Sequence, residues 1–219
     1  MPPLARRRVA GLVGAILLAS ARPALAQIEV EGYLGSSLNS PSPLSISQQG
    51  QPDIHVTAHW ATRPFRPTWY YAGRIGLWSG DRGWLLDFTH HKAYMIDRPA
   101  SIQQFEISNG INMMTLSRGF RRNKLSWAIG AGPVITFPLN RVRGQELARG
   151  RGFFGGYFLS VVTAMAGATR HVPLFAGAFL SLDGRLSATY LRVPVANGHA
   201  SVPNFAAHFH IGLGYGIPR

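Results

Sequence analysis

Apolar and polar residues alternate with a period of two over most of the chain after residue 26. The last segment is the clearest, because apolar side chains take every second position from Phe205 to Ile217, with His208 and His210 among the residues between them. This period is typical of a β-strand with one apolar and one polar face. The same alternation recurs at residues 69–77, 84–91, 125–137 and 180–190.

Turn residues divide the alternating part into eight predicted strands. We place them at residues 28–36, 69–79, 84–94, 106–118, 124–137, 153–167, 174–193 and 204–217. Short links at 80–83, 119–123 and 168–172 alternate with long links at 39–68, 95–105, 138–152 and 194–203. Outer-membrane barrels alternate in this way, with short periplasmic turns and long external loops. A strand-like piece at 54–60 falls inside the first long link.

The fold class predicted from these features is all-β, a closed antiparallel transmembrane β-barrel of eight strands. A ten-stranded alternative splits the seventh strand at Asp183-Gly184, which is a hairpin signal. The composition, with 46% hydrophobic and 14% charged residues, fits lipid-facing strands, although a soluble β-sandwich can have it too. After residue 26 no apolar run reaches the ~20 positions of a spanning helix.

The first 26 residues resemble a secretory signal. Three arginines at 6–8 precede an apolar run at 9–19, and small residues at 24–26 follow at the spacing of a cleavage site. An uncleaved anchor helix is the alternative, but the run is short. We therefore expect a signal peptide at 1–26 and an outer-membrane barrel at 27–219.

Charge and cysteine content narrow the choice of partners. The whole chain has a net charge of +13 and no cysteine, so neither disulfides nor thiolate chemistry is available. A secreted basic protein meets phosphorylated lipid rather than nucleic acid, and guanidinium groups bind phosphate oxygens in pairs. One external link holds four arginines that are either a phosphate clamp for lipid A or a solvated basic loop: Arg141, Arg143, Arg149 and Arg151.

Polar residues gather at the external end of the third and fourth predicted strands. A histidine and a carboxylate that converge could act as general base and orienting group, or hold a metal with open positions. The candidate catalytic residues are Asp87, His90, His91, Lys92, Glu106, Asn109 and Asn112. Alternatively, Asp87 and Glu106 neutralise Arg74, Arg185 and other charges inside the barrel. His90 and His91 are adjacent, so they point to opposite faces of the wall.

Two stretches resemble the rhizobial lipid A oxidase family. They are Trp69-Tyr70-Tyr71-Ala72-Gly73-Arg74 with Gly83-Trp84-Leu85-Leu86-Asp87-Phe88-Thr89-His90-His91-Lys92-Ala93-Tyr94, and Phe105-Glu106-Ile107-Ser108-Asn109-Gly110-Ile111-Asn112. The family pattern is Tyr-Tyr-Gly, Trp-Gly, Asp/Glu-Phe-x-His-x-Lys-x-Tyr and Glu-x-Thr-Asp-Gly-Leu-Asn. The chain departs from it at Ala72-Gly73, and at Ser108-Asn109, where Thr-Asp is usual. The resemblance covers residues 69–138.

The resemblance implies an oxidoreductase that converts the proximal glucosamine of lipid A to aminogluconate with dioxygen at the cell surface. Oxidation of a sugar by dioxygen normally uses a metal or organic cofactor; a divalent metal on His90 or His91 with a carboxylate is the one candidate these residues suggest. The alternative is a non-catalytic barrel with a structural, adhesion or surface-binding role. The last strand resembles those read by the barrel assembly machinery, and we expect a monomer in the Gram-negative outer membrane with lipopolysaccharide as its partner.

Overall fold

Eight antiparallel strands close into a barrel in the computed structural model, which describes residues 27–150 and 152–217. The ring consists of β1 (Gln27–Asn39), β5 (Tyr71–Ser79), β6 (Arg82–Met95), β7 (Ile102–Arg122), β8 (Leu125–Thr136), β11 (Phe158–Pro173), β12 (Ala178–Val195) and β13 (Gly198–Gly216). Pairing runs around the ring in chain order, and β13 pairs with β1 to close it. Within the described residues, no helix has the length and hydrophobicity to cross a bilayer. The expected signal peptide lies outside the described residues.

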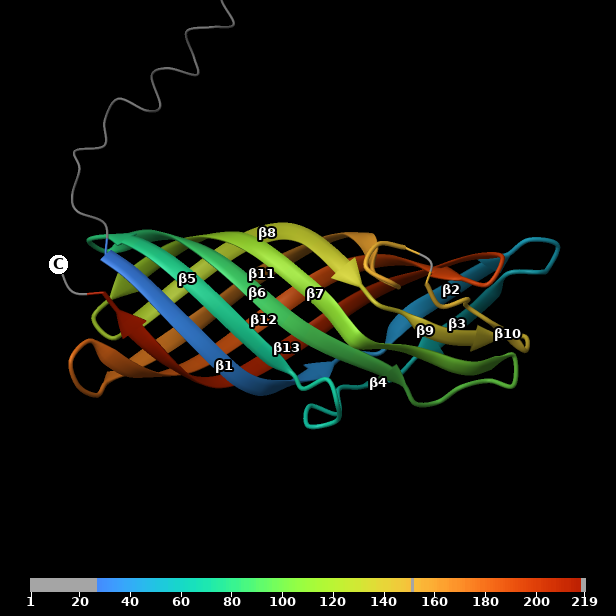
Figure 1. Ribbon diagram of the computed structural model, residues 1–219, viewed down its shortest axis with the longest axis horizontal. Helices are drawn as coiled ribbons and strands as arrows, with labels where there is room; N and C mark the ends of the chain where they lie inside the picture. The colour runs from blue at the N-terminus through green and yellow to red at the C-terminus, as the bar shows by residue number, and fades with distance from the viewer. Residues whose placement is uncertain (1–26, 151, 218–219) are drawn as a thin grey trace, which may run out of the picture.

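One end of the barrel has short turns and the other has long links, as the alternation of link lengths in the sequence predicts. Both ends of the described chain and the short turns lie at one end, on the left of Figure 1, and the smaller strands lie at the other. The smaller strands are β2 (Ser42–Gln48), β3 (Ile54–Ala58), β4 (Trp60–Ala61), β9 (Leu139–Val142) and β10 (Gln145–Glu146). Periplasmic turns are short and external loops long in such barrels, so the end with the smaller strands is the external one.

The eight-strand prediction is confirmed and the ten-stranded alternative is wrong. Asp183 and Gly184 lie inside β12 and pair without interruption with β11 on one side and β13 on the other. The predicted long link at 194–203 is also wrong, because β12 and β13 continue beyond the membrane and meet in a turn at residues 196 and 197. The piece at 54–60 forms β3 and β4, and β3 pairs with β2.

Alternate side chains of each strand face opposite environments. In β13, Phe209, Ile211 and Leu213 are 55–63% exposed, while His208 and His210 are at most 5% exposed. The other ring strands present apolar side chains outward in the same way, among them Val30, Ile75, Leu86, Leu116, Ile129 and Leu186. A closed barrel with an apolar outside and a polar inside is the architecture of outer-membrane proteins. The chain is therefore an outer-membrane β-barrel.

Charged residues fill the barrel at the level of this apolar band. The Arg74 Nε donates to the Asp87 Oδ1 at 2.7 Å, and the Arg185 Nε donates to the Asp183 Oδ2 at 2.6 Å. Arg185 also contacts Asp87 at 3.1 Å, and the His210 Nδ1 lies 2.8 Å from the Asp183 Oδ2. All five side chains are buried, so each charge must have an opposite charge beside it. We call these five residues the luminal ion cluster.

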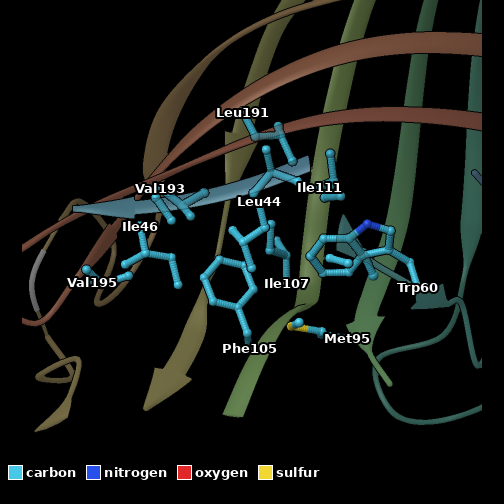
Figure 2. Close-up of a cluster of buried hydrophobic side chains, with 14 of the residues drawn as sticks. Leu44, Ile46, Trp60, Met95, Phe105, Ile107, Ile111, Leu191, Val193 and Val195 are labelled. Atoms are coloured by element: carbon cyan, nitrogen blue, oxygen red, sulfur yellow. The ribbon is translucent and has the colours of Figure 1, made fainter. Parts of the chain in front are cut away.

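The barrel interior becomes apolar beyond the membrane. The β2–β3 hairpin pairs along β13 and places Leu44 and Ile46 in the external mouth, where both are fully buried. Figure 2 shows these two side chains packed among Phe105, Ile107 and Val193 of the facing strands. Burial of this apolar area closes the external mouth and stabilises the part of the wall that water surrounds.

Removal of one member of the luminal ion cluster should destabilise the barrel strongly. Asp183→Ala leaves His210 without a carboxylate and Arg185 with Asp87 alone, and breaking a buried ion pair in this way costs about 3–5 kcal/mol. The free energy of unfolding, measured by urea titration of the barrel in lipid bilayers, reports the loss. Asp53→Ala, at an exposed position in an external turn, is the control and should leave stability unchanged. Equal stability of the two variants would show that the cluster does not hold the barrel together.

Candidate functional site

The wall of the barrel separates the predicted catalytic residues into two groups. Asp87 and His91 face the lumen, whereas His90, Lys92 and Asn112 face outward. The cause is the two-residue period of β6, which sends neighbouring side chains to opposite sides. The seven residues therefore do not form one site, and the prediction that His90 and His91 point to opposite faces is confirmed by their partners.

The luminal residues belong to structural networks. Asp87 accepts hydrogen bonds from Arg74 and Ser117 in addition to its contact with Arg185. The His91 Nε2 lies 2.9 Å from the Asn39 Oδ1. Asp87 and His91 are at most 1% exposed, so an outer-leaflet lipid cannot reach them. The interpretation that Asp87 neutralises Arg74 and Arg185 is confirmed, and the catalytic prediction for Asp87 and His91 is not supported.

His90 sits on the outer wall just above the apolar band. Its ring stacks on Tyr71, with the ring centroids 4.9 Å apart and the planes at 10°. The His90 Nδ1 lies 2.8 Å from the Asn112 Oδ1, and the His90 Nε2 lies 3.1 Å from the Thr68 Oγ1. A tautomer with the proton on Nδ1 satisfies both contacts, because Nδ1 then donates to Asn112 and Nε2 accepts from Thr68.

His90 and Asn112 are paired directly across β6 and β7, and β7 bulges on the external side of this pair. Between the pairs His91–Ile111 and Ala93–Ile107, β6 contributes Lys92 alone and β7 contributes residues 108–110. Gly110 has a φ of 119°, and a Cβ at this position would lie 2.6 Å from both the Asn112 Oδ1 and the His90 Cε1. Only glycine fits both requirements. Asn109 is half-buried in the same bulge.

Lys92 fastens a loop to the outside of the barrel. The Lys92 Nζ donates to the carbonyl oxygens of Arg66 and Thr68, each at 2.6 Å, and more weakly to that of Arg63 at 3.4 Å. These residues belong to the segment 62–70 between β4 and β5, which projects from the side of the barrel in Figure 1 and which we call the lateral loop. Lys92 is fully buried beneath it. Its ammonium group therefore positions the loop and does not touch solvent.

A polar cavity of about 450 Å³ opens on the outer wall beside the lateral loop. Arg63 and Arg66 place their guanidinium groups 4.9 and 5.8 Å from the ring centroid of Tyr94. Glu106 of β7 is the carboxylate of this cavity, and it accepts a hydrogen bond from Gln104. Arg98 and Arg141 complete its charged lining. We call this space the arginine cavity.

Of the three predicted phosphate-binding arginines that the structure describes, Arg141 alone lines this cavity. Arg141 lies in β9 and donates to the Glu146 Oε2 at 2.6 Å, which lowers the pKa of the Glu146 carboxyl. Arg143 instead binds the β2–β3 hairpin through Gln48 and the Pro52 carbonyl oxygen. Arg149 is exposed in the loop that follows β10, and Arg151 lies outside the described residues. The phosphate-binding role of these four arginines therefore stays a prediction.

The predicted metal site has no matching donor set. His90 is bonded to an amide and a hydroxyl, and His91 to an amide and a hydroxyl of its own. No group of three or more histidine, aspartate or glutamate side chains arranged to hold a metal ion occurs within residues 27–150 and 152–217. We therefore derive no metal-dependent step from these residues.

Sequence reasoning missed Arg63, Arg66 and Arg98 as site residues. The signal was present in Arg63-Pro64-Phe65-Arg66-Pro67, where basic residues flank an aromatic one. The same loop carries two exposed aromatic side chains, Phe65 at 79% and Trp69 at 57%. Exposed aromatic residues at this height suit the interface between membrane and water.

The fold and the apolar outer surface of its strands define a small outer-membrane β-barrel. Comparison with known proteins gives the following findings. No family model and no curated protein match the sequence. Among solved structures, Ail, the attachment invasion locus protein of Yersinia pestis, is 11% identical, with a TM-score of 0.41 over 88% of this chain and 97% of Ail. Neisserial surface protein A is 12% identical, with a TM-score of 0.38 over 87% of this chain and 96% of that one. The outer membrane protein AlkL is 8% identical, with a TM-score of 0.47 over 89% and 91%.

Loss of the Lys92 ammonium group should release the lateral loop. Lys92→Met keeps the length of the side chain but removes the donor of all three carbonyl contacts. We expect chymotrypsin to cleave the bond after the exposed Phe65 at least tenfold faster in this variant, because proteolysis follows the population of the opened loop. Lys124→Met, in the periplasmic turn between β7 and β8, is the matched control. Unchanged cleavage after Phe65 in a folded Lys92→Met protein would contradict the role given to Lys92.

Proposed function

We propose that this barrel oxidises the proximal glucosamine of lipid A in the outer leaflet, with dioxygen as the electron acceptor. The proposal combines the resemblance to the rhizobial lipid A oxidases with one observation, the outward convergence of the motif residues. His90, Lys92, Tyr94, Glu106 and Asn112 all belong to the same patch of the outer wall, around the lateral loop and the arginine cavity. A lipid that never leaves the membrane could reach this patch.

The height of the patch supports a lipid substrate. Phe88 is the last residue of β6 on the lipid-facing side below the covered region, and Lys92 follows it by four residues on the same face. At about 3.3 Å per residue and a strand tilt of about 40°, Lys92 lies roughly 10 Å above the end of the apolar band. Lipid headgroups occupy that layer. The sugar of a lipid A molecule beside the barrel would then lie next to the arginine cavity.

Glu106 is the group we assign to proton transfer. In the proposed reaction the C1 hydroxyl of the sugar loses its proton to Glu106, and C1 loses its hydrogen with two electrons. Dioxygen is the final acceptor of the two electrons and two protons and becomes hydrogen peroxide, while C1 becomes a lactone carbonyl; a redox metal or organic cofactor would carry the electrons between them. Addition of water opens the lactone to the aminogluconate, so the lipid gains one oxygen atom.

We assign supporting roles to other motif residues. Lys92 positions the loop that carries Arg63 and Arg66, and the His90–Asn112 pair holds the wall beneath it. These contacts would orient the sugar indirectly, through the arginines and Glu106. Orientation of this kind contributes to catalysis by fixing the reacting groups in place before the reaction.

A non-catalytic barrel with a surface-binding role is the second candidate. One observation favours it: Lys92 and His90 are almost completely covered and make contacts that a structural wall needs in any case. In that function Glu106 would be one of several charges in a binding cavity. The two functions differ in whether the lipid is chemically changed.

The mass of lipid A distinguishes the two functions. The host must make lipid A with a free C1 hydroxyl, because a phosphate on that oxygen blocks formation of the carbonyl. Aerobic expression of the protein should then increase the mass of lipid A by one oxygen atom. Glu106→Gln should abolish this gain, since the amide cannot accept the proton, without changing the heat-modified gel mobility of the folded barrel.

Glu146→Gln is the matched control, since Glu146 lies beside Arg141 but does not line the arginine cavity. It should keep the activity. Folded wild-type protein that leaves lipid A unchanged in air would reject the oxidase function and leave the binding function. Activity retained by Glu106→Gln would remove Glu106 from the proposed mechanism.

A further inference from the structure

The arginine cavity carries more positive charge than its carboxylates can balance. Four arginines line it, and the nearby carboxylates are Glu106 and, through Arg141, Glu146. Asp97 is the sequence neighbour of Arg98, but it pairs with His59 at 3.3 Å. The four guanidinium groups and the Lys92 ammonium therefore exceed these two carboxylates by three charges in the described part of this region, and Arg141 is the one arginine of the four in a salt bridge there. An anion would meet a site that is already electropositive.

Two of these guanidinium groups are fixed in advance. The carbonyl oxygens of Arg63 and Arg66 accept from Lys92, so the backbone of both residues is fastened to β6. Their guanidinium groups lie 4.9 and 5.8 Å from the centroid of the Tyr94 ring, and the Lys92 Nζ lies 5.5 Å from the same centroid. Cations gathered on one aromatic ring lose little freedom when a ligand arrives. The arrangement is therefore that of a binding site rather than of a flexible basic surface.

We propose that the arginine cavity binds a phosphate group of lipopolysaccharide, and that Arg63, Arg66, Arg98 and Arg141 are its ligands. A guanidinium group binds two phosphate oxygens at once, and several of them around one cavity select a phosphate over a singly charged group. The cavity volume of about 450 Å³ lies within the ~300–1,000 Å³ range of small-ligand sites. It therefore has room for a phosphate together with the sugar that bears it.

The lateral loop indicates the lipid source of this phosphate. Phe65 and Trp69 are exposed on the same loop as Arg63 and Arg66. Aromatic side chains at the membrane interface beside arginines bring the loop to the level of the lipid headgroups. The inference depends on the proposed function only for the identity of the lipid, because binding of the phosphate does not require oxidation of the sugar. The C1 hydroxyl must be free for oxidation, so the bound phosphate belongs to another position of the lipid.

Binding to three probes tests the proposal with the purified mature barrel in detergent. The probes are lipid A that carries phosphate, the same lipid A after enzymatic removal of phosphate, and inorganic phosphate, with bound molecules counted by native mass spectrometry. We expect phosphorylated lipid A to bind at least tenfold more tightly than either of the others. Arg63→Gln/Arg66→Gln should remove most of this preference, because each charged hydrogen bond that is lost weakens binding by roughly tenfold.

Arg149→Gln is the matched control, because Arg149 is an exposed arginine of the external side that does not line the cavity. It should bind like the wild-type protein. If the double variant does not fold, Arg98→Gln tests the cavity from outside the lateral loop and should weaken binding by roughly tenfold. Equal binding of the two forms of lipid A, or unchanged binding by the folded cavity variants, would overturn the phosphate site. Inorganic phosphate bound as tightly as the lipid would overturn the lipid source.

The mass measurement of the proposed oxidation remains independent of this result. Phosphate-dependent binding without a gain of oxygen would leave the phosphate site intact and reject the oxidase. A gain of one oxygen atom by lipid A, with binding that does not depend on phosphate, would support the oxidase and reject the phosphate site. The two failures can therefore be told apart.

Discussion

The luminal ion cluster determines which face of β5, β6, β12 and β13 is turned to the membrane. Arg74, Asp87, Asp183 and Arg185 come from β5, β6 and β12, and they satisfy one another only when all of them point inward. A shift of one residue in any of these strands would place a bare charge against lipid, at a cost of several kcal/mol. The inward position of Asp87 in turn sends Phe88, His90 and Lys92 outward along β6. The chemistry of the outer wall therefore depends on the charges inside.

The environment of the wall reverses at the membrane surface. Within the apolar band the lumen is polar, and beyond it the lumen is filled by Leu44, Ile46 and their neighbours. The bulge of β7 opposite Lys92 lies at this change, where the outer side stops facing lipid and becomes covered by the lateral loop. Buried polar contacts such as the His90–Asn112 pair can form on the outside only at this level. The candidate site lies at the level where the outside of the barrel passes from lipid to water.

The sequence predicted the barrel well because its signal is local. Alternation along residues 205–217, and the turn residues between strands, set strand number and facing direction without knowledge of distant contacts. Loop structure was less predictable. The strands run on beyond the membrane, so the link at 194–203 was mistaken for a loop, and the pairing of β2 with β13 joins residues about 150 positions apart. Long-range pairing of this kind leaves no periodic trace.

The candidate site was predictable only where it depends on the local alternation of side chains along a strand. The two-residue alternation along β6 correctly places His90 and His91 on opposite faces. It cannot show that the lateral loop covers Lys92, or that Arg63 and Arg66 lie near the Tyr94 ring. Those contacts depend on the path of a loop that has no regular pattern. The four arginines chosen from one external link shared sequence proximity, whereas the cavity is assembled from the lateral loop, β9 and the link before β7.

The alternation of β6 between lumen and lipid can be measured directly, because the chain has no cysteine and a spin label can be introduced at one position at a time. Labels at successive positions from 84 to 92, in the barrel reconstituted in bilayers, report collision with dissolved oxygen, which is concentrated in the lipid. The account predicts high collision rates at 84, 86 and 88, low rates at 85, 87, 89 and 91, and a fall at 90 and 92 beneath the lateral loop. High rates at 87 and 91, or the absence of a two-residue period, would contradict it.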